Sequence, residues 1–460
     1  MADGQTVDLV QVIDRQKIGG FHIALILLSF FTMVIDGYDI GAAAFAAPAL
    51  IKEWHVSREA LGFMFSAGLV AGLFGPWMFG YFGDRFGRKN AVVVGLFFFG
   101  ALTLASVWST DISMLAYLRF FAGLGISGML PAVVALNNEF APRRLQATMV
   151  TIMFAGITFG GGLPGIVAAK YMATDGWRIL FWIGGLFPIA LGVLHIFALP
   201  ESIKFLSLRE DRKPALLRLL RRIDPSLRVD ERTHFVISTE DNRTKFQPSA
   251  LFVGKLKFIT PLFWVSTACS LMVFYFINQW MPTLLSGAGI PLTHAVLAIT
   301  VFQFAGTLGG LAIMYPLDRW GFFPVPILFA LGIPVVFFIG HPNMPDWGIM
   351  LLLAGAGFTV LGLNFGNIAM IGPVYPTYVR SWGVGATFGA GRVGGVLGPA
   401  IGGILLGLHL TLQQIFWVAC LPLVLGLIVT AILTPIYLRE VHQVKFGGTA
   451  RLKPVPAVGH

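Results

Sequence analysis

Long apolar stretches recur along nearly the whole chain and constrain its fold more than any other feature. About 20 apolar residues are enough to cross the ~30 Å hydrocarbon core of a bilayer as an α-helix. With 56% hydrophobic and only 12% charged residues, the chain is predicted to be an all-α, multi-pass integral membrane protein. We identify twelve apolar stretches, at residues 22–45, 60–80, 91–108, 112–137, 147–169, 177–198, 258–281, 295–315, 324–340, 347–372, 382–408 and 412–437.

One long polar segment divides these stretches into two sets of six. It predicts an N-terminal six-helix bundle at 1–198, a cytoplasmic connecting loop at 199–257, a C-terminal six-helix bundle at 258–437 and a cytoplasmic tail at 438–460. Within the loop, "PALLRLLRRI" at 214–223 places leucines on one helix face and arginines on the other. This pattern fits a short helix on the membrane surface, and it fits a solvated linker helix equally well.

The basic residues indicate how the chain is oriented. Thirteen of the 32 Lys and Arg residues lie between Lys204 and Lys257. The segments before the first stretch, after each even stretch and after the last hold 26 of them, the other loops hold four, and two lie inside stretches. The positive-inside rule therefore places both termini and the long loop in the cytoplasm. The net charge of +10 reflects this topology, and no nucleic acid partner is expected.

The two halves repeat each other at a fixed offset. A shift of 234 residues relates three separate pairs: Asp84 and Asp318, Pro142 and Pro376, and Phe154 and Phe388. The phenylalanines open two glycine-rich segments, "FAGITFGGGLPG" and "FGAGRVGGVLGP". Two parallel six-helix repeats predict a solute path between the halves, which rock to open it to each side in turn.

Short motifs resemble those of a known superfamily. "GYFGDRFGRKN" between the second and third stretches, with a weaker copy "YPLDRWG", resembles the signature of the major facilitator superfamily. Further segments resemble one family within it, the aromatic acid:proton symporter family. These are "DGYDIGAAAFAAPAL" in the first stretch and "QWMPTLL", "VFQFAGTLGG", "YPTYVRSWGVG" and "GAGRVGG" further on. The resemblance implies the twelve-helix fold of two pseudo-symmetric bundles and the import of small aromatic carboxylates with protons.

The resemblance also implies a charged cytoplasmic gate that holds the halves together in one state. The glycines at 160, 161, 162 and 165 are expected to let helix backbones approach closely. The gate residues implied are Asp84, Arg85, Arg88, Glu139, Arg143, Glu201, Asp318, Arg319 and Arg380.

Four charged residues lie inside the apolar stretches: Asp36, Asp39, Arg119 and Arg392. A charge at mid-membrane costs roughly 2.5–3.5 kcal/mol on insertion scales, so such residues face a cavity and have partners. The resemblance pairs Asp39 with Arg119. Burial favours the protonated form of Asp39 and the arginine favours the charged form, so drawing Arg119 away would load a proton. Asp36 is either a second proton site or a group that tunes Asp39, and a structural role is the alternative for both aspartates.

Arg392 has no acidic neighbour in its own half, and a guanidinium binds a carboxylate through two parallel hydrogen bonds. We therefore expect it to hold the acid group of the solute; a helix-packing role is the alternative. Polar side chains in the spans give further candidate contacts: Tyr38, Trp280, Asn364 and Asn367.

The prediction from sequence is a monomeric, proton-coupled importer of a small aromatic carboxylate in a bacterial inner membrane. Its partners are the solute, the proton and the lipid bilayer. No phosphate cradle, metal cluster or nucleophile with a base is found, so neither a cofactor nor enzymatic activity is expected. The alternatives are transport of another organic acid such as muconate or nicotinate, sugar transport, export, and a receptor that does not transport.

Overall fold

Helices make up almost all of the described part of the chain. The computed structural model describes residues 6–16, 18–224, 227, 233–236, 248–290, 292–341, 344–375, 379–408 and 410–446. The N-terminal half contains β1 (Thr6–Asp8), α1 (Leu9–Asp14), α2 (Gly20–Trp54), α3 (Arg58–Phe86), α4 (Arg88–Ala105), η1 (Ser106–Trp108), α5 (Ile112–Phe140), η2 (Arg143–Leu145), α6 (Gln146–Asp175) and α7 (Arg178–Ala198). The connecting loop contains α8 (Ile203–Ser207), η3 (Glu210–Arg212), α9 (Lys213–Ile223), β2 (His234–Val236) and η4 (Pro248–Phe252). The C-terminal half contains α10 (Leu256–Gly287), α11 (Leu292–Trp320), α12 (Pro324–Ile339), α13 (Asp346–Ala356), η5 (Gly357–Leu361), α14 (Gly362–Val374), α15 (Arg380–Gly407) and α16 (Leu412–Phe446).

The membrane-spanning helices match the twelve apolar stretches. Within the described residues, eleven helical units are long and apolar enough to cross a membrane, and the 16-residue α12 is the twelfth. The tenth unit is composite, because α13 and α14 are joined by the π-helical turn η5. The prediction of an all-α membrane protein with twelve spanning helices is confirmed.

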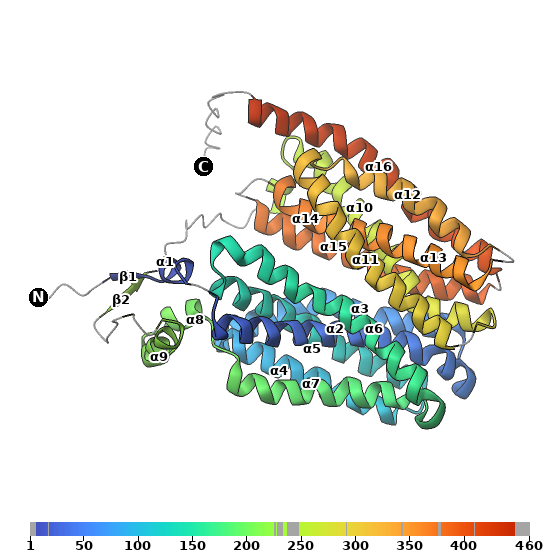
Figure 1. The fold of residues 1–460 in the computed structure, drawn as a ribbon, viewed down its shortest axis with the longest axis horizontal. Helices are drawn as coiled ribbons and strands as arrows, with labels where there is room; N and C mark the ends of the chain where they lie inside the picture. Colours follow the sequence, from blue (N-terminus) through green and yellow to red (C-terminus); the bar gives the residue numbers. More distant parts are fainter. Residues whose placement is uncertain are drawn as a thin grey trace, which may run out of the picture.

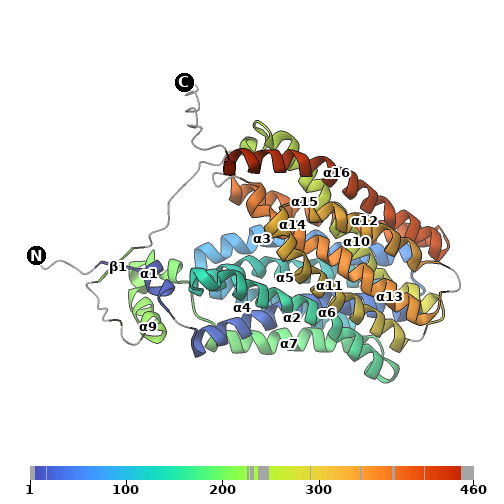
Figure 2. The same ribbon diagram turned by 45° about the horizontal axis from the view of Figure 1, so that its top comes forward.

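The spanning helices form two bundles that lie side by side. Figure 1 shows α2–α7 in the lower bundle and α10–α16 in the upper one, and Figure 2 shows the same division from another direction. The bundles meet where α3 packs against α15, where α6 packs against α11, and where α2 packs against α10. These three helix pairs therefore form the interface between the halves.

Glycines bring helix backbones into direct contact inside each bundle. A Cβ at Gly160 of α6 would overlap the carbonyl of Val34 in α2, and a Cβ at Gly394 of α15 would overlap that of Ala268 in α10. The two contacts are related by the sequence repeat, since 394 − 160 and 268 − 34 both equal 234. The repeat therefore preserves the close helix packing within each half.

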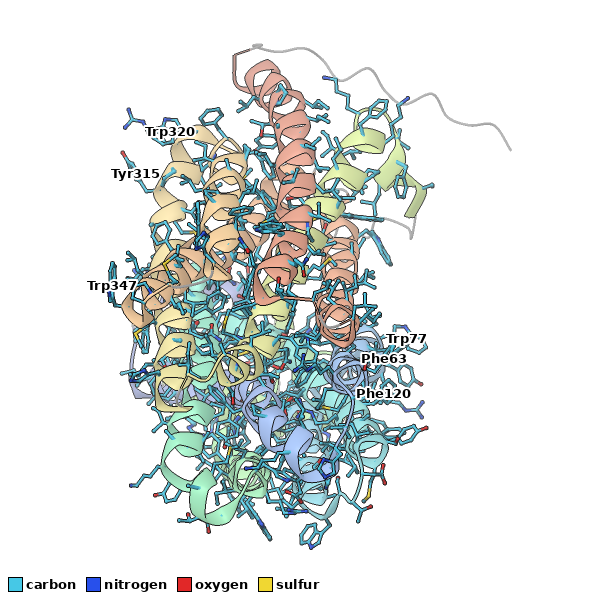
Figure 3. The ribbon with its side chains drawn as sticks, turned by 90° about the vertical axis from the view of Figure 1, so that its right-hand side faces the viewer. Phe63, Trp77, Phe120, Tyr315, Trp320 and Trp347 are labelled. Atoms are coloured by element: carbon cyan, nitrogen blue, oxygen red, sulfur yellow. The ribbon has the colours of Figure 1, made fainter. Side chains whose placement is uncertain are left out.

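Large apolar side chains cover the outside of both bundles. Phe63, Trp77 and Phe120 project from one flank, and Tyr315, Trp320 and Trp347 from the other (Figure 3). Trp77 is 83% exposed, which would be unfavourable for so large an apolar side chain in water. A bilayer around the bundles removes this penalty.

A small cluster formed by β1, β2, α1 and α9 extends beyond one end of the N-terminal bundle (Figures 1 and 2). In it, β1 pairs in parallel with β2, and the apolar face of α9 packs with that of α1. Leu216 and Leu220 are almost completely buried there. The arrangement supports the linker-helix interpretation of 214–223 over the membrane-surface one, because the chain itself already covers these leucines.

The halves share an apolar core only toward the opposite end. Residues of α2 from Tyr38 to Leu50 belong to the same core as Met281 and Leu284 of α10, whereas Leu25 to Ile35 of α2 belong to a separate core with α1 and α9. At this end Arg58 Nη1 donates to the carbonyl of Leu406 (3.3 Å). We call it the closed end.

Candidate functional site

An ion pair joins α2 to α5 in the middle of the N-terminal bundle. Arg119 Nη1 donates to Asp39 Oδ1, and Nη2 donates to Asp39 Oδ2 at 2.8 Å. Both side chains are about nine-tenths buried. Two parallel hydrogen bonds in a dry environment satisfy both charges and fix their orientation. The sequence-predicted pair is thus brought together, and Asp39 accepts hydrogen bonds from both terminal nitrogens of Arg119.

Two glycines on α3 make room for arginines from opposite halves of the molecule. Gly68 lies beside the guanidinium of Arg119. One turn further, a Cβ at Gly72 would overlap the guanidinium of Arg392, which reaches across from α15. Sequence reasoning singled out neither glycine, although their spacing of four residues is the signal of a shared helix face.

Asp36 lies within electrostatic range of both Asp39 and Arg392. It is half-buried, and the charges of Asp39 and Arg392 both act on it. Within the described residues, neither Asp36 nor Arg392 takes part in a hydrogen bond or an ion pair. The second arginine is therefore close to a carboxylate without being bound by one, which leaves its donors open.

Tyr275 of α10 belongs to the same group, and sequence reasoning missed it. Its ring packs against Gly395 of α15, and its hydroxyl lies within electrostatic range of Asp36 and Arg392. A tyrosine in an apolar, aromatic-rich run carries no periodic signal of its own. Only the fold shows that it faces the charged residues.

Two residues expected to contact the solute use their polar atoms elsewhere. The hydroxyl of Tyr38 donates to the carbonyl of Leu180 in α7 (3.1 Å). Trp280 is fully buried, packs edge-on against Phe65 and donates from Nε1 to the carbonyl of Pro399 (2.9 Å). In this conformation the polar atoms of Tyr38 and Trp280 thus join helices, and their contact with the solute stays a prediction.

Asn364 and Asn367 form a hydrogen-bonded network between α14 and α10. Ser270 Oγ donates to Asn364 Oδ1 (3.0 Å), and Asn367 Nδ2 donates to Ser270 Oγ (3.1 Å). Asn367 is fully buried, and Ser266 also donates to it. These contacts explain Asn367 as helix packing, whereas Asn364 remains partly exposed.

Part of the expected gate is assembled inside the N-terminal half. Arg88 pairs with Glu139, and Ser202 Oγ donates to the other oxygen of Glu139 at 2.6 Å. Glu201 accepts hydrogen bonds from the backbone N–H groups of Lys89 (3.0 Å) and Ser202 (2.8 Å). Its position at the N-terminus of α4 favours a negative charge, while burial raises the pKa of the Glu201 carboxyl.

The glycine that precedes α4 explains one motif position. Gly87 has φ = 108°, a conformation that favours glycine, and a Cβ there would overlap the carboxylate of Glu201. Ser202, which joins Glu139 to this cluster, was missed from sequence because a serine in a polar loop has no distinguishing pattern.

Among the described side chains, three other gate residues do not join this cluster. Asp84 is exposed, and among the described residues it has no ion pair. Arg85 and Arg319 donate to Tyr81 and Tyr315 on their own helices. The remaining three side chains lie outside the described ones: Arg143, Asp318 and Arg380.

The chain is similar in sequence to known membrane transporters. The family model described as Major Facilitator Superfamily matches residues 29–371. The 4-hydroxybenzoate transporter PcaK of Pseudomonas aeruginosa is 32% identical, with 92% of this chain and 94% of the relative covered. A gallate transporter of Pseudomonas putida is 31% identical, with 98% and 97% covered, and a benzoate transport protein of Acinetobacter baylyi is 30% identical, with 92% and 91% covered.

Solved structures agree with the fold. A crystal structure of a D-xylose-proton symporter superposes with a TM-score of 0.69 at 16% identity, covering 90% of this chain and 97% of that one. The inward-open xylose transporter XylE from E. coli gives 0.68 at 15% identity, covering 89% and 95%. At such identities the likeness concerns the fold alone. The family match and the curated relatives together show that the chain belongs to the major facilitator superfamily and groups with members named as aromatic acid transporters.

Proposed function

We propose that this protein imports a small aromatic carboxylate together with a proton across a bacterial inner membrane. The observation that carries the proposal is the unbound guanidinium of Arg392, which faces Asp36 across the interface between the halves. A partly buried arginine without a bound anion is a strong site for a carboxylate. The names of the relatives support a benzoate-like acid as that anion.

The four charges within the spanning helices support coupling to one proton. Asp36 and Asp39 carry two negative charges and Arg119 and Arg392 two positive ones, so the empty site is neutral when all are ionised. Adding a monoanion leaves an excess negative charge in a low-dielectric region, which is costly. Uptake of one proton by an aspartate restores neutrality. We assign that proton to Asp39: Arg119 keeps its carboxylate ionised in the empty site, and the carboxylate takes up a proton when solute binding draws Arg119 away.

In this mechanism the solute competes for Arg392 and changes the charges around Asp36 and Asp39. The loaded site then closes, because protonation removes the carboxylate that would otherwise resist burial. The two moving units are residues 1–198 and 258–437. The halves are joined at the closed end, and the basic loops lie at the other end, which the positive-inside rule assigns to the cytoplasm. We therefore infer that this conformation is inward-facing, with both termini in the cytoplasm.

Uptake into proteoliposomes with an imposed inward proton gradient tests the proposal. Radiolabelled 4-hydroxybenzoate, protocatechuate, benzoate and nicotinate are compared with glucose in liposomes with and without the protein. We expect gradient-dependent accumulation of at least one aromatic acid and none of glucose. Accumulation of glucose alone, or of the acids without any response to the gradient, would contradict the proposal.

A further inference from the structure

Three polar side chains follow one face of α10 from the charged site toward the closed end. Tyr275, Gln279 and Thr283 are spaced four residues apart and so lie on one helix face. Tyr275 marks the direction of that face, since it lies beside Asp36 of α2 and Arg392 of α15. Gln279 is about two and a half turns from Ser270 and so lies on the opposite side of α10. Ser270 contacts α14. The face therefore points away from α14, toward the interface with the N-terminal half.

Two of these side chains are buried without the partners that their polar atoms require. Gln279 is 3% exposed and Thr283 8% exposed. Among the described residues, Gln279 Oε1 and Thr283 Oγ1 accept or donate no hydrogen bond. Other buried hydroxyls on α10 are satisfied, as Thr267 is by the carbonyl of Phe263. Unpaired buried polar atoms are costly and call for an explanation.

The closed end supplies that explanation. At the level of Gln279, Trp280 bonds to Pro399 and packs on Phe65 of the other half. Apolar residues of α2 and α10 close the same region. When the halves separate there, Gln279 and Thr283 gain access to water and to a solute entering from that side. Their polar atoms are thus suited to the opposite conformation.

We propose that Gln279, assisted by Thr283, binds a ring hydroxyl of the solute when the closed end opens. The proposal rests on the function proposed above, with the carboxylate on Arg392. Four residues of helix rise about 6 Å, which is comparable to the separation of the carboxylate and the para-hydroxyl of a benzoate. A carboxylate near Tyr275 therefore places a para-hydroxyl at the level of Gln279. The hydroxyl donates a hydrogen bond to the amide oxygen of Gln279.

Substitutions that keep the shape of the side chain test this assignment. Gln279→Leu and Thr283→Val are compared with Thr267→Val, a control on the same helix whose hydroxyl bonds only within α10. Each is reconstituted, and KM for uptake is measured with 4-hydroxybenzoate and with benzoate, which lacks the hydroxyl. A site that binds a hydroxyl discriminates against the analogue without it.

We expect Gln279→Leu to raise KM for 4-hydroxybenzoate roughly 3- to 10-fold and to leave that for benzoate within about twofold. Thr283→Val has a smaller effect of the same kind, and Thr267→Val has none. Thermal unfolding of Gln279→Leu should occur at the wild-type temperature or above, because an unpaired buried oxygen is removed. Equal changes for both acids overturn the proposal. If the wild-type protein accumulates neither acid, it is the underlying transport function that fails.

Discussion

Two arginines lie near the middle of the spanning helices, and their surroundings differ. Arg119 is held by Asp39 within the N-terminal half, with both charges buried and satisfied. Arg392 reaches from the C-terminal half to Gly72 and, among the described residues, has no bound carboxylate. The difference indicates a division of roles, in which one arginine sets the state of a proton carrier and the other receives the solute.

The sequence repeat strengthens this contrast. The 234-residue shift carries packing glycines onto each other, yet it relates Asp39 to Val273, Arg119 to Leu353 and Arg392 to Thr158. Packing is therefore shared by the halves, whereas the charged residues inside the spanning helices are not. Each of the following substitutions alters one side of the comparison.

The largest effect is expected from Asp39→Asn. For one proton per monoanion, each unit of pH gradient supports about tenfold accumulation of the solute. The asparagine amide cannot take up the proton, although it can still accept a hydrogen bond from Arg119, so the coupling is lost. With a gradient of two pH units, accumulation should fall on the order of 100-fold, while exchange of labelled for unlabelled solute continues. Asp175→Asn, at an exposed helix end, is the control. Parallel loss of exchange and accumulation would assign Asp39 a structural role.

Arg392→Lys should weaken solute binding without abolishing coupling. The ammonium keeps the charge but cannot form the two-pronged contact, and losing one charge-assisted hydrogen bond corresponds to roughly a 10-fold rise in Kd. Equilibrium binding of labelled 4-hydroxybenzoate measures it. Arg178→Lys is the matched change at the exposed pair with Glu53. An unaltered Kd would remove Arg392 from the site.

Asp36→Asn tests whether the net charge of the site sets the coupling to the proton. Asp36 acts electrostatically on Arg392 and so competes with the solute carboxylate for the guanidinium. Removing the negative charge of Asp36 should therefore tighten solute binding roughly 3- to 5-fold. With Asp36 neutral the empty site carries one net positive charge, so the charge balance no longer requires a proton with each monoanion. The number of protons taken up per solute, measured with a pH-sensitive dye, should therefore fall below one. A value that stays at one would refute charge balance as the origin of the coupling.

The smallest effect is expected at the contact between the halves. Trp280→Phe keeps an aromatic ring against Phe65 but loses the bond to Pro399, worth about 1 kcal/mol, and so should shift the conformational equilibrium about fivefold toward the opposite state. Labelling of an Ala46→Cys reporter in the shared core, by an impermeant thiol reagent added outside, measures the shift. Trp182→Phe on the exposed surface is the control, and equal labelling of the two would exclude Trp280 from the gate.

Sequence patterns predicted the framework of this protein well and its polar contacts less well. Hydropathy located the twelve spans because a bilayer requires long apolar helices. The pairing of Asp39 with Arg119 was expected from a motif. Trp280 and Asn367 were expected at the solute, because a polar atom in a span was assumed to need a cavity. A neighbouring carbonyl or serine satisfies it just as well, as Pro399 and Ser270 do, and only the three-dimensional arrangement shows which.

The glycine contacts that repeat between the halves have a mechanical consequence. Helices that touch backbone to backbone, as at Gly160 and Gly394, cannot slide past one another easily, so each bundle turns as a stiff lever about its centre. The 28-residue α15 is about 42 Å long. A tilt of α15 by about 10° around Arg392 moves the charged residues by about an ångström or less and the ends of the helix by roughly 3–4 Å. Capture of one small anion is thus amplified into opening and closing at the two membrane surfaces.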